Sequence, residues 1–123
     1  MNEFSDLTRR GRARRLRPIA CRALEERGLG DASLAFLADD SNTLFRARLP
    51  GGAGYVVRIG THGPTAHSPA EAAAEAAWLA ALASSGLAVP EPVADRRGRL
   101  VSLYAAPGAP GERVVVVFRW LPG

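Results

Sequence analysis

The chain has 123 residues, which is enough for one small domain with a single hydrophobic core. Apolar residues make up 47% of it and charged residues 23%, a balance typical of soluble globular proteins and not of disordered or fibrous ones. The net charge is +4, and all 16 basic residues are arginines. The single cysteine, Cys21, cannot form an internal disulfide, and no apolar run approaches the roughly 20 residues that span a membrane. With no secretion signal either, we expect a cytoplasmic protein without membrane partners.

The first 30 residues form a basic segment that carries eight of the arginines. Helix-compatible sequence runs from Leu7 to Arg27, and Pro18 is its one interruption. Because proline is favoured at the first helical position, the pattern allows a second helix to begin there. We therefore divide the chain into a basic helical segment, residues 1–30, and a following domain, residues 31–123.

Three short strands are expected next, at 33–38, 42–49 and 55–59. The last of these alternates, so that its apolar residues share one face and Val56 and Arg58 share the other. Two further strands are expected at 100–105 and 114–120, where the continuous apolar run of residues 114–118 indicates a strand covered on both faces.

An alanine-rich helix lies between the third and fourth strands. Ser68-Pro69-Ala70-Glu71 has the pattern of a capping box, and Gly86 ends the helix. Its large apolar residues, Trp78, Leu79 and Leu82, form a stripe that we expect to pack inward. The element order predicts an α+β fold: a five-stranded antiparallel sheet with one packed helix, preceded by the N-terminal basic helix.

Glu75 precedes this stripe by three and four residues, which places it on the buried side of the helix or at its edge. A carboxylate in that position needs a partner, and Arg58 of the third strand is the candidate. A strand cation that meets a helix carboxylate is how protein kinases fix the group that holds nucleotide phosphates. The same spacing also fits two solvated surface charges, and Glu71 is explained as the capping acid.

Five stretches in this order resemble the N-terminal lobe of the phosphotransferase family that includes aminoglycoside phosphotransferases and choline kinases, which share a protein-kinase-like fold. They are NTLFRA (42–47), YVVRI (55–59), EAAWLAAL (75–82), VPEPV (89–93) and VFRWLPG (117–123). Each motif is weak alone, and their order and spacing carry the resemblance, which covers roughly residues 20 to 123.

The resemblance implies nucleotide-binding roles for seven residues. Arg58 would contact the phosphates, where kinases commonly have Lys, and Glu75 would be its helix partner. Backbone N–H groups of the first hairpin would face the phosphates. In the third strand, Val56 would line the adenine slot. The backbone of a hinge over 118–121 would read the adenine edge. The seven are Ser41, Asn42, Val56, Arg58, Glu75, Arg119 and Leu121. The hinge residues equally fit a buried strand that runs into a Pro-Gly turn.

The family's catalytic loop, His-Gly-Asp with a downstream Asn and a metal-binding Asp, has no counterpart here, since His62-Gly63 is followed by Pro64. The resemblance places the catalytic base, the Mg²⁺ ligands and the substrate pocket in a C-terminal lobe. We therefore expect a parent kinase that uses Mg·ATP to phosphorylate a small-molecule hydroxyl. The 123-residue chain alone is expected to bind nucleotide without transferring phosphate.

Two other functions stay open. The arginines of residues 9–17 could contact nucleic acid or another anionic partner, although no aromatic residue is interleaved with them, which makes nucleic acid the less favoured partner. Alternatively, the chain could dock onto a separately encoded C-terminal lobe through an apolar surface around Trp120 and Leu121.

Overall fold

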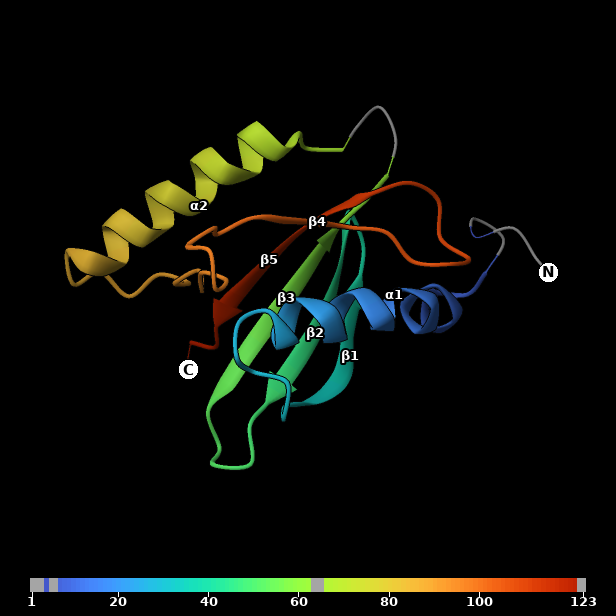
Figure 1. Ribbon diagram of the computed structural model, residues 1–123, viewed down its shortest axis with the longest axis horizontal. Coiled ribbons are helices and arrows are strands. Elements are labelled where there is room, and N and C mark those ends of the chain that lie inside the picture. The colour runs from blue at the N-terminus through green and yellow to red at the C-terminus, as the bar shows by residue number, and fades with distance from the viewer. Residues whose placement is uncertain (1–3, 5–6, 63–65, 122–123) are drawn as a thin grey trace.

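A computed structural model describes residues 4, 7–62 and 66–121, and shows one sheet with a helix on each side (Figure 1). Part of the His62-Gly63-Pro64 sequence and the end of the last motif lie outside the described residues, at 63–65 and 122–123. The elements in chain order are α1 (Arg9–Glu25), β1 (Ser33–Asp39), β2 (Asn42–Arg48), β3 (Gly54–Gly60), α2 (Pro69–Ser84), β4 (Ser102–Tyr104) and β5 (Arg113–Arg119).

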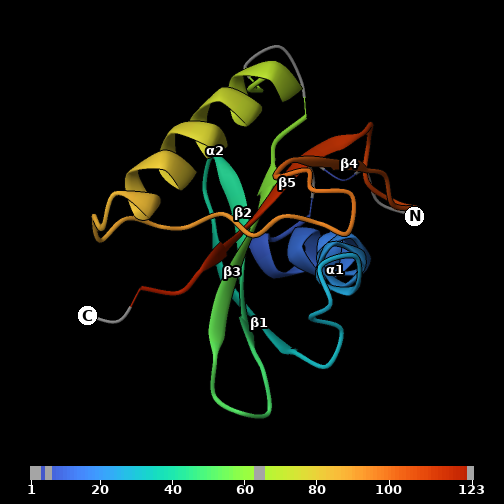
Figure 2. The same ribbon diagram turned by 60° about the vertical axis from the view of Figure 1, so that its left-hand side comes forward.

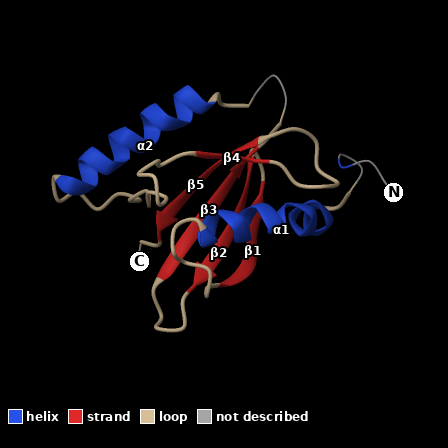
Figure 3. Ribbon diagram, in the orientation of Figure 1, coloured by secondary structure: helices blue, strands red, loops and turns tan. Residues whose placement is uncertain are grey.

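The five strands form a single sheet in the order β1-β2-β3-β5-β4, and each neighbouring pair is antiparallel. Figure 3 shows this sheet as one continuous layer, with the short β4 at its edge beside β5. The structure confirms the predicted α+β fold with five antiparallel strands.

The alternation predicted for β3 is confirmed, because Val57 and Ile59 are fully buried while Val56 and Arg58 point to the opposite face. The buried face of the sheet packs against α1, and together they form the hydrophobic core. In β5, consecutive residues from Val115 to Phe118 are all buried, which confirms a strand covered on both faces.

Helix α1 covers the core side of the sheet, although its sequence is most conspicuous for its charge. The largest side chains of its apolar face, Leu16, Ile19 and Leu24, are at most 2% exposed. The helix runs through Pro18 without a break, so the second helix that the sequence allowed there does not form. A proline inside a helix costs one backbone hydrogen bond, and the buried residues on both sides of it hold the two halves against the sheet.

Helix α2 lies on the other side of the sheet (Figure 2). The predicted capping box is present: Ser68 Oγ accepts from the N–H of Glu71, whose carboxylate accepts from the N–H of Ser68. The helix buries only Ala72 and Ala76, and Trp78 is 65% exposed. The inward-packing stripe was therefore a wrong prediction, since close approach to the sheet favours alanine methyl groups over the larger side chains.

The end of α1 is tied to the segment before β4 by Arg27, which is only 8% exposed. Its guanidinium donates to the carbonyls of Ala23, Val93 and Leu100 and to the hydroxyl of Ser102. This buried cation is satisfied by neutral acceptors, and it fixes the path of the chain from α2 to β4.

Candidate functional site

The charged pair inferred from the sequence is present. Arg58 Nη2 lies 2.5 Å from Glu75 Oε1, so the third strand and α2 meet through this contact. The side chains are 25% and 48% exposed, which places Glu75 at the edge of the buried side of the helix and not within it. The Arg58 guanidinium also lies 5.0 Å from the centre of the Phe118 ring. Strand β3, strand β5 and helix α2 thus hold one cation in a fixed place.

An apolar cavity of about 450 Å³ opens on one side of this pair. Val56 forms its wall on the sheet, and the segment that follows β5 forms its far end. Four predicted site residues besides Val56 line it, namely Arg58, Glu75, Arg119 and Leu121. A slot of this size with apolar walls and a few charged groups has the dimensions of a small-molecule site.

A smaller cavity of about 140 Å³ opens on the other side of the pair. Asn42 at the start of β2 lines it, together with Gly60, His67 and Glu71. Arg58 and Glu75 line both cavities, so the two spaces meet at the ion pair. The result is a cleft, apolar at the β5 end and polar at the hairpin end, which we call the front cleft.

Ser41 is the one predicted site residue that the structure sets apart from the front cleft. It lines a separate space with Arg12, Asp39 and Thr43 on the α1 side of the hairpin. Asp39 accepts hydrogen bonds from Thr43 Oγ1 at 2.7 Å and from Arg12 Nε at 2.8 Å. Its carboxylate therefore fixes the β1–β2 hairpin to α1, and Ser41, in the bend between the two strands, lies on that side.

The segment after β5 is held by its own contacts. The N–H of Arg119 donates to the carbonyl of Glu91, and Arg119 Nε lies 2.6 Å from Glu91 Oε1. The Trp120 ring lies 4.2 Å from the Arg46 guanidinium, whose buried Nε has no hydrogen-bond partner among the described residues. The amide of Arg119 is therefore already bonded, whereas that of Leu121 has no partner in the described part of the chain.

Residues 34–123, well over half of the chain, match the model of the phosphotransferase enzyme family. The chain belongs to this family. The resemblance noted in the sequence is thereby confirmed for the stretches from residue 42 onwards. None of the curated proteins compared with the chain matches it.

Two solved kinases share the fold of this phosphotransferase-family chain. A microcompartment-associated aminopropanol kinase is 30% identical, with a TM-score of 0.67, over 85% of this chain and 31% of its own. An amicoumacin kinase, solved in complex with AMP-PNP, Ca²⁺ and Ami, is 24% identical, with a TM-score of 0.66, over 95% of this chain and 34% of its own. The chain thus spans about a third of the length of the kinases it matches.

In the apolar cavity, three lining residues outside the predicted hinge escaped the site prediction: Trp78, Leu79 and Pro90. Trp78 and Leu79 were assigned to packing, although their spacing of three and four residues from Glu75 already put them on its side of the helix.

The Ser68 contacts lower the pKa of Glu71, with the backbone hydrogen bond as the largest cause, so this carboxylate stays charged beside the cleft.

Over the ranges that the structure describes, no group of three or more His, Cys, Asp or Glu side chains is placed to hold a metal ion. Neither described helix has the length and apolar character needed to cross a bilayer.

Proposed function

We propose that this chain is the nucleotide-binding lobe of an ATP-dependent kinase that phosphorylates a hydroxyl group of a small molecule. The observation that carries the proposal is the Arg58–Glu75 contact at the meeting point of an apolar slot and a polar recess. A nucleotide has the matching division, with an apolar base at one end and a charged phosphate chain at the other. The family membership and the two kinase neighbours support the same reading.

In this proposal the adenine lies in the apolar slot, between Val56 on β3 and the segment after β5. The free amide of Leu121 donates to the adenine edge, and Arg119 contributes its carbonyl, because its amide is bonded to Glu91. The phosphates lie at Arg58, whose position Glu75 fixes, with Asn42 at the hairpin end of the cleft. A guanidinium held by a carboxylate and an aromatic ring loses little freedom when it binds a phosphate.

Phosphoryl transfer also needs a base and Mg²⁺ ligands, which the family places in a C-terminal lobe. Mg²⁺ would then enter with the nucleotide and be held from that lobe. The chain alone should bind nucleotide without turning it over. Exposed apolar side chains beside the cleft, Trp78 at 65% and Leu121 at 42%, are the surface that we assign to the second lobe.

The test is calorimetric titration of the chain with ATP and with adenosine. Arg58→Ala should weaken ATP binding about tenfold or more, since a charge-assisted hydrogen bond is lost, and should change adenosine binding little. Val56→Phe should weaken both ligands by filling the slot. Arg14→Ala is the matched control, because Arg14 is an exposed arginine on α1, far from the cleft. Equal ATP affinity in the wild type and Arg58→Ala, or no saturable ATP binding, would refute the proposal.

A further inference from the structure

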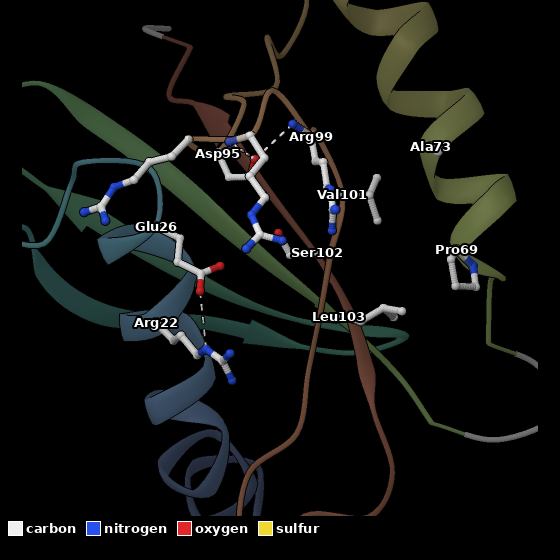
Figure 4. Close-up of a pocket in the computed structure, with 11 residues that line it drawn as sticks. Arg22, Glu26, Pro69, Ala73, Asp95, Arg99, Val101, Ser102 and Leu103 are labelled. Atoms are coloured by element: carbon white, nitrogen blue, oxygen red, sulfur yellow. Dashed lines mark hydrogen bonds and ion pairs between the residues drawn. The ribbon is translucent and has the colours of Figure 1, made fainter.

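A second cavity lies at the β4 edge of the sheet, between the end of α1 and the first half of α2 (Figure 4). Its volume is about 720 Å³, and it shares no lining residue with the front cleft. We call it the rear pocket. Its walls come from α1, the turn at residues 95–99, β4 and α2, so it is built from four separate segments of the chain.

The acidic groups of the rear pocket are already engaged by their own contacts. Glu26 accepts a hydrogen bond from the Tyr104 hydroxyl, which is the main reason its pKa is lowered, and its other oxygen lies 3.5 Å from Arg22 Nε. Burial acts to raise the pKa of Asp95, but the N–H groups of Arg99 and Arg97 outweigh it and the pKa is lowered. Both carboxylates are therefore ionised and engaged at neutral pH.

The basic groups of the rear pocket exceed these acids, because four arginines face two carboxylates. Arg22 pairs with Glu26, and Arg96 donates to the carbonyl of Glu25. The backbone N–H groups of Arg97 and Arg99 donate to Asp95, whose carboxylate also attracts the Arg99 guanidinium, but neither guanidinium makes a hydrogen bond or close ion pair within the described residues. Two guanidinium groups whose donors form no hydrogen bond within the described residues therefore line one cavity, where an anion would find charge and hydrogen-bond donors together.

The opposite wall of the rear pocket is apolar. Figure 4 shows Leu103 and Val101 on the strand side and Ala73 and Pro69 on the helix side. Leu103 is 44% exposed, although it belongs to a strand of the sheet. An anion that also carries an apolar body would cover these side chains while its charged end meets the arginines.

We propose that the rear pocket binds a phosphate ester of a small organic molecule. The phosphate accepts from Arg97 and Arg99, whose planar donors match two phosphate oxygens at once. The organic part lies against Leu103, Val101 and Ala73. This site is independent of the nucleotide assignment, because neither its residues nor its ligand class depends on the front cleft.

The test uses phenyl phosphate as the probe and backbone amide shifts in nuclear magnetic resonance as the readout. Saturable shifts are expected at residues 97–103, and phenol, which lacks the anion, should produce none. The double variant Arg97→Ala/Arg99→Ala should weaken binding about tenfold or more. Arg14→Ala/Arg17→Ala removes the same charge from two exposed positions of α1, and should change the affinity less than about twofold.

Three results would overturn the site. If both double variants bound phenyl phosphate equally weakly, the binding would come from general charge attraction and not from the rear pocket. Loss of binding in Arg58→Ala but not in Arg97→Ala/Arg99→Ala would place the ligand in the front cleft. Shifts that never saturate would mean that no site exists. Unchanged thermal unfolding of each variant shows that a loss of binding does not come from a loss of fold.

Discussion

Breaking the Arg58–Glu75 contact should cost little folding stability, even though its atoms approach to 2.5 Å. Half-exposed ion pairs contribute about 0.2–1 kcal/mol, because water screens the charges and the long side chains lose freedom. A fully buried pair that loses one partner costs about 3–5 kcal/mol instead. With side chains 25% and 48% exposed, this pair belongs with the former group, and we expect a coupling energy of at most about 1 kcal/mol.

The assay is a double-mutant cycle by urea unfolding, with Glu75→Gln, Arg58→Met and the combined variant. The cycle cancels the contact of Arg58 with Phe118, which both Arg58 variants lose. The coupling energy should shrink at high salt, as it does for exposed charges. A coupling energy above about 2 kcal/mol that salt does not change would show a structural ion pair, and the pair would no longer argue for phosphate binding.

Three further predictions concern the scaffold. Arg27→Ala should lower the free energy of unfolding by about 3 kcal/mol or more, measured in urea, because four buried or part-buried acceptors lose their donor. An effect under about 1 kcal/mol would contradict the role of Arg27 in holding the end of α1. Ser68→Ala should cost about 1 kcal/mol by removing the cap of α2, and Ser68→Asp should restore it. Tyr104→Phe removes the main cause of the lowered pKa of Glu26. The folding stability that comes from this lowered pKa is present above the unfolded pKa of about 4.5 and is lost as the pH falls through the lower folded value. The difference in unfolding free energy between wild type and Tyr104→Phe should therefore narrow below pH 4.5. A difference that does not depend on pH would contradict this link between the hydrogen bond and the pKa.

Local rules were sufficient for the parts of the structure that local chemistry determines. The cap at Ser68 needs only four neighbouring residues, and it is present as predicted. Strand alternation put Arg58 opposite the core face, and the helix repeat put Glu75 near the sheet, so the pair could be inferred before any coordinates.

The remaining errors come from questions that periodicity does not answer. A helix repeat shows which residues share a face, but it does not show what covers that face, and Trp78 is left open while Ala72 and Ala76 make the contact. Pro18 suggested a helix break because the backbone hydrogen bond that it removes is visible in the local sequence. The burial that offsets this loss comes from strands that are distant in the sequence. The phosphate-facing role of Ser41 stays a prediction, although Ser41 and Asn42 line different spaces.

Helix α2 makes only a small buried contact with the sheet, so the position of this helix also determines the geometry of the front cleft. Besides the half-buried Leu79 and Leu82, its fully buried contacts are two alanine methyl groups worth about 0.8 kcal/mol each, and one half-exposed ion pair adds about as much again. Covering the open ring of Trp78 would exceed either methyl group, since aromatic rings bury 150–250 Å². A partner surface laid over that ring would therefore help to hold the helix in place, and with it the Glu75 carboxylate that contacts Arg58. Lobe assembly and phosphate-site assembly would then be one event.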